Sequence, residues 1–186
     1  MLIGVSGKSG SGKSSVAKYL ANKLGATLID LDVWSKEIRD NYPEKILEIV
    51  KDSSILVEGK IDSKRLGNVL FGNSNLMKDY NLFIYEELRK RLDSELKKDR
   101  IYVLDSIFLP IMEIFNNCEY KILVVCDDLV RKERIIKRDH ISEEYFNRRE
   151  SFKIVYNEKD YDYVIDNENN YQSQVNEIIK SMGLKS

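Results

Sequence analysis

A glycine-rich stretch at residues 7–14 limits the possible folds of this chain more than any other part of its sequence. Its letters, GKSGSGKS, match the pattern G-x-x-x-x-G-K-[S/T] at every specified position. A short apolar run precedes the loop at residues 2–6, and an amphipathic stretch follows it, with Val16, Leu20 and Leu24 at i, i+4 and i+8. A chance glycine-rich turn would need neither a strand before it nor a helix after it. The pattern and its context therefore predict a loop that binds the phosphates of a nucleoside triphosphate.

The residue types in this loop suit phosphate binding for physical reasons. Glycines let the backbone curl so that successive N–H groups point at phosphate oxygens, and the following helix adds the positive end of its dipole. We expect Lys13 to reach the β- and γ-phosphates of ATP, and the Ser14 hydroxyl to ligate Mg²⁺. The loop residues expected to bind ATP are Gly7, Gly10, Ser11, Gly12, Lys13, Ser14 and Ser15.

Five short apolar runs along the chain predict a parallel sheet. Each is bounded by polar residues, and they cover residues 2–6, 26–30, 101–105, 120–126 and 161–165. Stretches with helical periodicity separate or follow them, for example at residues 84–96 and 175–182. Continuous apolar strands that alternate with helices are typical of a parallel sheet covered on both faces. With the loop, they predict the α/β, three-layer fold of P-loop NTPases, built on a five-stranded parallel sheet.

Two segments are too long for a simple alternation of strands and helices. Residues 34–96 exceed one crossover and must hold a mostly helical insertion, and residues 138–159 form a second insertion that is polar and aromatic. We therefore expect three parts. They are a nucleotide-binding core (1–32, 99–137 and 160–186), a helical acceptor-binding domain (33–98) and a lid (138–159).

The composition argues against several classes of protein. Hydrophobic residues make up 42% of the chain, which is enough for a core, so wholesale disorder is not expected. The formal net charge of −1 lacks the basic excess of a nucleic-acid binder. No apolar run approaches the roughly 20 residues that span a bilayer. Cys118 and Cys126 lack the spacing of a zinc site or redox pair, so we expect free core thiols in a reducing compartment. We expect a cytoplasmic monomer or weak oligomer with a small-molecule partner, and no nucleic acid or membrane.

Three aspartates follow predicted strands at the edge where functional groups collect in this fold. Asp30 and Asp32 come after the second predicted strand, and Asp105 ends the third. One such acid can accept the proton of an attacking hydroxyl, and another can hold Mg²⁺ directly or through water. We assign the metal role to Asp105 together with Ser14. Asp32 is preferred for a functional role, with capping of a helix that begins near residue 33 as the alternative, and Asp30 is left open.

Three arginines have the spacing of one helix face. Arg131, Arg134 and Arg138 lie at i, i+3 and i+7. From residue 131 to residue 153 there are eight Lys/Arg and five Asp/Glu, a net charge of +3. A movable basic lid would neutralise charge on a transferring phosphoryl group and exclude water. A solvated helix with Glu133 and Asp139 as ion-pair partners is the alternative. Because the chain also has a phosphate loop, we favour the lid for Arg134 and Arg138.

The class of nucleotide-dependent protein can be narrowed further. The sequence has no N-K-x-D motif, which a GTPase should carry to bind guanine. An ATP-driven motor normally needs a larger domain. A chain of 186 residues with two insertions fits a small-molecule kinase better.

Several stretches, taken together, resemble the dephospho-coenzyme A kinase family over nearly the whole chain. They are residues 3–14, 28–32 (LIDLD), 61–71 (IDSKRLGNVLF), 134–144 (RIIKRDHISEE) and 163–167 (YVIDN). In order, they look like the family's phosphate loop, acid pair, helical substrate signature, lid and adenine-side turn. The loop alone is unspecific, whereas the other stretches in this order and spacing are much more specific. Lys8 stands where the family usually has glycine, and the family's His-Pro pair is absent around Asn81 and Leu82.

The resemblance implies transfer of the γ-phosphate of ATP to the ribose 3′-hydroxyl of dephospho-coenzyme A, the last step of coenzyme A synthesis. It implies that Asp32 is the general base, that Arg138 is a lid residue acting on phosphates, and that Asn167 lies beside the adenine. The expected catalytic residues are thus Lys13, Asp32 and Arg138. Arg134 and Asn167 join the ATP-binding set, and the cofactors are ATP and Mg²⁺. A nucleoside or nucleotide kinase with another small acceptor, and a nucleotide-binding module with weakened catalysis, are the alternatives. Whether Asp30 or Asp105 shares the base role stays open.

Overall fold

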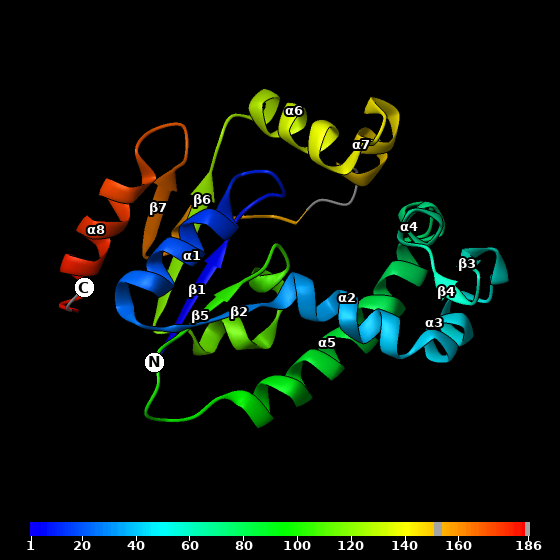
Figure 1. The fold of residues 1–186 in the computed structure, drawn as a ribbon, viewed down its shortest axis with the longest axis horizontal. Coiled ribbons are helices and arrows are strands. Elements are labelled where there is room, and N and C mark those ends of the chain that lie inside the picture. The colour runs from blue at the N-terminus through cyan, green and yellow to red at the C-terminus, as the bar shows by residue number, and fades with distance from the viewer. Residues whose placement is uncertain (151–153, 185–186) are drawn as a thin grey trace. The chain divides into compact units, whose positions relative to one another are not determined.

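The computed structural model describes residues 1–150 and 154–184, and the chain divides into two compact units (Figure 1). Within the described residues, the first unit consists of residues 1–31, 96–146 and 154–184. The second unit consists of residues 32–95 and 147–150. The predicted phosphate loop and the five predicted strands all belong to the first unit.

A five-stranded sheet forms the framework of the first unit. Its strands lie in the order β2-β5-β1-β6-β7, and each neighbouring pair is parallel. The strands are β1 (Leu2–Ser6), β2 (Thr27–Asp30), β5 (Tyr102–Asp105), β6 (Tyr120–Val125) and β7 (Tyr163–Asp166). Each begins and ends within two residues of the position predicted from the apolar runs. The predicted five-stranded parallel sheet is confirmed.

The sheet is covered on both faces, which explains its continuous apolar strands. Helices α1 (Lys13–Leu24) and α8 (Tyr171–Ser181) lie on one face (Figure 1) and pack against Ile3 and Val5 of β1. Gly4 faces the other way, because side chains alternate along a strand. A Cβ added at Gly4 would lie 2.9 Å from Leu109 Cδ2 and 3.0 Å from Cys118 Sγ. Those residues belong to the segment of the 3₁₀ helices η2 (Leu109–Ile111) and η3 (Glu113–Asn117), which completes the third layer.

The strand register brings the predicted functional segments to one edge of the sheet. Asp30 of β2 pairs with Asp105 of β5, and Asp105 also pairs with Val5 of β1. On the other side, Val125 of β6 pairs with Asp166 of β7. From β1 the chain first builds one half of the sheet and then the other, so the strand order reverses beside β1. Ligands of open parallel sheets bind beyond the carboxyl ends of the strands at such a point.

The second unit is mostly helical, as predicted for residues 34–96. Its helices are α2 (Leu31–Asn41), whose first residue belongs to the first unit, α3 (Pro43–Val50), α4 (Ser63–Phe71) and α5 (Ser74–Glu95). Helix α5 buries Ile84, Leu88 and Leu92 of the periodic stretch predicted at residues 84–96, and it ends at Glu95, one residue before Leu96. The side chain of Asp62 caps α4 by accepting a hydrogen bond from the Arg65 N–H at 2.8 Å.

A small hairpin in the second unit was not predicted. After the 3₁₀ helix η1 (Ser53–Ile55), strands β3 (Leu56–Val57) and β4 (Lys60–Ile61) pair antiparallel. Glu58 and Gly59 connect them, with φ values of 50° and 76°. Positive φ at both positions is typical of a two-residue hairpin turn. Strands of two residues are too short to show any period in the sequence.

The remaining helices lie in or next to the predicted lid. They are α6 (Asp128–Asp139), α7 (Glu143–Glu150) and the 3₁₀ helix η4 (Glu158–Asp160). Residues 151–153 of the predicted lid lie outside the described residues. Across the part of the chain that the structure describes, none of the helices has the length and apolar character needed to cross a membrane.

Candidate active site

The predicted phosphate loop, residues 7–14, follows the last residue of β1, Ser6, and its last two residues, Lys13 and Ser14, begin α1. Two of its glycines leave no room for a side chain. A Cβ at Gly7 would lie 2.3 Å from the Val124 carbonyl oxygen, and a Cβ at Gly12 would lie 1.9 Å from Asn167 Nδ2. Gly12 also has a φ of 88°, which disfavours any other residue. The glycines therefore let the loop pass close to the ends of β6 and β7.

The loop has polar groups suited to an anion. Ser11 Oγ is buried and has no hydrogen-bond partner among the described residues, a costly state that a bound phosphate oxygen would relieve. Ser14 and Ser15 are exposed in the first turn of α1, and that turn contains no acidic residue. The N–H groups and dipole at a helix N-terminus favour negative charge. These donors fit the phosphate chain of a nucleotide.

Lys13 and Asp105 form a buried ion pair at the carboxyl edge of the sheet. Lys13 Nζ lies 2.9 Å from Asp105 Oδ1, and their side chains are 8% and 1% exposed. Asp30 is the register partner of Asp105 on the neighbouring strand. The structure thus brings together the loop lysine and two of the three predicted aspartates. An arriving polyphosphate would share the Lys13 ammonium with Asp105.

Asp32 belongs to the second unit, where it is the second residue of α2. The helix begins at Leu31 rather than near residue 33, so Asp32 lies inside the first turn and not in the flanking cap position. Burial raises the pKa of the Tyr85 hydroxyl, and the negative charge of Asp32 raises that pKa further. Tyr85 is therefore a neighbour of Asp32 that was not predicted. The two residues are far apart in the chain, and no sequence pattern links them.

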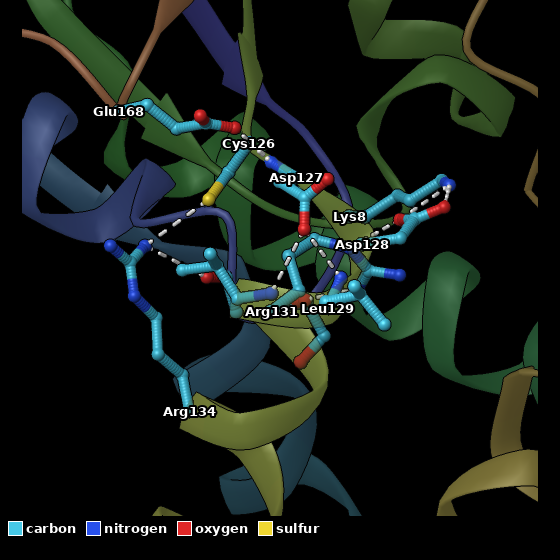
Figure 2. Close-up of polar contacts among 11 residues, drawn as sticks. Lys8, Cys126, Asp127, Asp128, Leu129, Arg131, Arg134 and Glu168 are labelled. Carbon is cyan, nitrogen blue, oxygen red and sulfur yellow. Dashed lines mark hydrogen bonds and ion pairs between the residues drawn. The ribbon is translucent and has the colours of Figure 1, made fainter.

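The three predicted arginines of α6 differ in their surroundings, and Figure 2 shows Arg131 and Arg134. Arg131 is buried, and its guanidinium donates to the Ser9 carbonyl oxygen and to Asp128. Arg134 Nη1 lies 3.4 Å from the Gly10 carbonyl oxygen and 3.5 Å from Cys126 Sγ. Arg138 pairs with Asp139 at 2.6 Å, the partner named in the solvated-helix alternative. Arg131 and Arg134 therefore contact the phosphate loop, whereas Arg138 pairs with its chain neighbour Asp139.

Arg131 was not among the predicted site residues. Its i, i+3, i+7 spacing placed it on the arginine face, but spacing alone does not tell which member of a face is buried. A further sequence signal was Asp128, three residues earlier and thus one helical turn away. The Asp127 side chain caps the helix by accepting from the Leu129 and Val130 N–H groups, which sets where α6 begins and hence where Arg131 points.

Asn167 contacts the phosphate loop directly. Its Nδ2 donates to the Ser11 carbonyl oxygen at 2.7 Å, and its backbone N–H donates to the Val125 carbonyl oxygen at 3.0 Å. The neighbouring Glu168 accepts from the Asp127 N–H at 2.6 Å (Figure 2). These bonds tie the turn after β7 to the loop and to the start of α6. A nucleotide bound to the loop would therefore lie near Asn167.

The two cysteines are not equivalent, although both were expected in the core. Cys118 is buried, whereas Cys126 is only partly buried and lies beside Arg134 at the end of β6. Burial raises the pKa of the Cys118 thiol to about 12. Because the thiolate is the reactive form, we expect iodoacetamide to alkylate Cys126 in the native protein and to spare Cys118. Peptide mass mapping before and after unfolding in guanidinium checks this, and rapid native labelling of Cys118 would contradict its placement.

Comparison with known proteins decides the family. The sequence profile of the Dephospho-CoA kinase family matches residues 1–173, which span both units of the fold. This chain belongs to the dephospho-CoA kinase family. A dephospho-CoA kinase of Fusobacterium nucleatum is 31% identical over 92% of both chains. A dephospho-CoA kinase of Aquifex aeolicus is 30% identical over 96% of this chain and 94% of its own length.

Solved structures agree with this dephospho-CoA kinase fold. The protein TT1252 from Thermus thermophilus superimposes with a TM-score of 0.77 at 24% identity, over 98% of this chain and 95% of the other. The dephospho-CoA kinase from Campylobacter jejuni gives a TM-score of 0.55 at 24% identity, over 97% and 96% of the two chains. At these identities the likeness shows the fold alone.

Proposed function

We propose that this chain transfers the γ-phosphate of ATP to the ribose 3′-hydroxyl of dephospho-coenzyme A, giving coenzyme A and ADP. The observation that carries this proposal is the family match over residues 1–173, which includes both the phosphate loop and the helical unit. The buried polar groups of the loop supply the chemistry for binding ATP. A reducing compartment, the cytoplasm, suits two cysteines that are free in the structure.

We propose that different parts of the chain bind ATP and the acceptor. We assign ATP binding to the core made of residues 1–32, 99–137 and 160–186, and acceptor binding to residues 33–98. Residues 138–159 act as the lid. In such a transfer the protein mainly positions its substrates and stabilises charge, because the phosphoryl group passes through a loose transition state. This chemistry requires that the γ-phosphate and the acceptor hydroxyl be held next to each other and in line.

In this scheme the residues around the loop hold the triphosphate. The loop N–H groups and the Lys13 ammonium balance the charge of the β- and γ-phosphates. The Ser14 hydroxyl and the Asp105 carboxylate would hold Mg²⁺, directly or through water, and the ion would neutralise charge on the transferring group. The described residues contain no cluster of three or more His, Cys, Asp or Glu suited to a metal. Mg²⁺ usually keeps waters and substrate phosphates among its ligands.

Asp32 is the proposed general base. A ribose hydroxyl is a poor nucleophile at neutral pH, and its proton must leave as the new P–O bond forms. A carboxylate both orients the hydroxyl and accepts that proton. Tyr85, whose hydroxyl pKa is raised by burial and then by the negative charge of Asp32, belongs to the same unit as Asp32.

Arg138 is the proposed lid residue that stabilises the transferring phosphate. In the structure its guanidinium pairs with Asp139, so it must exchange this partner for the phosphate during closure. We expect Arg138→Ala to lower kcat by more than it weakens ATP binding, because the charge that Arg138 stabilises is largest in the transition state. Steady-state kinetics together with calorimetric ATP binding check this. Weaker ATP binding with unchanged kcat would make Arg138 a ground-state contact only.

The acceptor assignment is tested with a panel of alcohols. ADP release is followed by a coupled assay with dephospho-coenzyme A, adenosine, AMP, or no acceptor. The proposal predicts that kcat/KM for dephospho-coenzyme A exceeds the value for the smaller acceptors. Preference for adenosine or AMP would favour a nucleoside or nucleotide kinase, and ATP binding without turnover on any acceptor would favour a binding module.

A further inference from the structure

The outer part of the phosphate loop is a tight turn that packs on α6. The Ser11 N–H donates to the Lys8 carbonyl oxygen at 3.0 Å, which closes a four-residue turn over residues 8–11. A Cβ added at Gly10 would lie 2.9 Å from Ile135 Cγ1 and 3.0 Å from the Arg131 carbonyl oxygen. The turn and the helix are therefore in direct contact at Gly10.

The φ of Gly10 identifies which way the middle peptide of this turn points. Gly10 is the third residue of the turn and has a φ of 79°. Turns of types I and II differ mainly by a flip of the central peptide, and type II requires a φ near +80° at its third residue. The central peptide here joins Ser9 to Gly10. Because a trans peptide is planar, its C=O and N–H point in opposite directions, so the flip also decides where the Gly10 N–H points.

Arg131 contacts that same peptide. Its Nη1 donates to the Ser9 carbonyl oxygen, and its Nε donates to Asp128 Oδ1 at 2.9 Å (Figure 2). The Arg131 side chain is only 3% exposed. A cation buried to this extent is costly unless it is paired and hydrogen-bonded. Arg131 is paired with Asp128 and also donates a hydrogen bond to the loop backbone, at the Ser9 carbonyl oxygen.

Asp128 joins Arg131 to a second cation from the loop. The Lys8 ammonium donates to both Asp128 carboxylate oxygens, at 3.0 and 3.2 Å. The hydrogen bonds from Lys8 and then from Arg131 hold the pKa of the Asp128 carboxyl below its usual range, so the group is charged at neutral pH. Asp128 therefore fastens Lys8, at one end of the turn, to the helix residue that contacts the middle of the turn.

We propose that Arg131 is a positioning residue that fixes the orientation of the Ser9–Gly10 peptide, with the Lys8–Asp128 pair holding the turn against it. The Arg131 guanidinium draws the Ser9 carbonyl oxygen toward α6, so the Gly10 N–H points away from α6 and stays a donor for the phosphate chain. This inference rests on the proposed function in one respect, namely that the loop binds ATP. It assigns Arg131 no contact with the substrate.

The test is Arg131→Lys, assayed for ATP and ADP binding by calorimetry without acceptor. Lysine keeps a cation for Asp128, but one ammonium on a shorter side chain does not reach both Asp128 and the Ser9 carbonyl oxygen. We expect a melting temperature near that of the wild type, with ATP and ADP affinity reduced about tenfold, the usual effect of losing one hydrogen bond to a charged group. The Gly10 amide resonance should also shift in the ¹⁵N spectrum. Arg131→Met, which removes both bonds, should weaken binding at least as much.

The matched control is Lys132→Met, which removes a neighbouring cation of α6 that pairs with Glu143 and not with the loop. ATP affinity should then stay within about twofold of wild type, as for an exposed surface pair. The inference is overturned if Arg131→Lys binds ATP and ADP as tightly as Lys132→Met does. A wild-type chain that binds ATP without phosphorylating dephospho-coenzyme A would overturn the proposed function alone, and one that does not bind ATP would overturn both.

Discussion

Replacing Lys13 with alanine should reduce kcat/KM for ATP by at least about 10²–10³-fold, the range typical of losing one preorganised electrostatic contact to a developing charge. Lys13 is the cation that we expect to follow the β- and γ-phosphates. Its ammonium already lies at the carboxyl edge of the sheet, 2.9 Å from Asp105 Oδ1. The measurement is the steady-state rate of ADP formation with dephospho-coenzyme A.

The structure also predicts a stability effect for this variant. Lys13→Ala takes the ammonium away from a buried carboxylate, and breaking a buried pair typically costs about 3–5 kcal/mol. The assay must therefore be run well below the melting temperature of the variant. Lys18→Ala is the matched control, because Lys18 is an exposed lysine on the same helix. Near-normal turnover by a folded Lys13→Ala protein would contradict the kinase assignment.

Asp32→Asn should lower kcat by about 10²–10⁴-fold, the usual contribution of a general base. The substitution keeps the shape of the side chain and removes its charge. ATP binding should barely change, because the lost group is assigned to the acceptor. Rates are measured at saturating ATP and dephospho-coenzyme A, and ATP binding is measured separately by calorimetry.

A structural role for Asp32 predicts a different outcome. Asp32 lies in the first turn of α2, where a negative charge is worth about 0.3–1 kcal/mol through the helix dipole. Asn would then cost a little stability and leave kcat within a factor of two or three. Asp30→Asn is the matched comparison, since Asp30 ends the strand just before α2. If Asp30→Asn is the variant that loses turnover, the base is Asp30, and Asp105 becomes the next candidate if neither does.

The parts of the fold that follow from local pattern were predicted, and the parts that depend on long-range contacts were not. The five strands are apolar runs because both faces of the sheet are covered. Burial on both faces requires apolar residues along each strand, and such runs can be recognised in the sequence. The hairpin at Leu56–Ile61 was missed because strands of two residues have no period and because Glu58–Gly59 is not a strong turn signal. The two cysteines looked alike in sequence, yet Cys118 is buried, with its Sγ packed close to Gly4 of β1, and Cys126 is only partly buried.

The candidate site shows the same division. The position of the loop between a strand and a helix was predicted, because its glycines and its Lys-Ser pair form a local sequence pattern. The arginine face was predicted from spacing, but its buried member turned out to be Arg131, while Arg138 pairs with Asp139. Spacing predicts a common face and does not say which part of that face meets the loop. The Lys8–Asp128 pair joins residues far apart in the chain, and a single sequence carries no signal for it.

The most direct measurement is identification of the product formed from ATP and dephospho-coenzyme A. The purified chain is incubated with both substrates and Mg²⁺, and the products are separated and analysed by mass spectrometry and ³¹P NMR. We expect each ADP formed to be matched by one coenzyme A, with the new phosphomonoester on the ribose 3′-hydroxyl. ADP formed without any phosphorylated acceptor, or a phosphate placed elsewhere than on the 3′-hydroxyl, would contradict the proposed function.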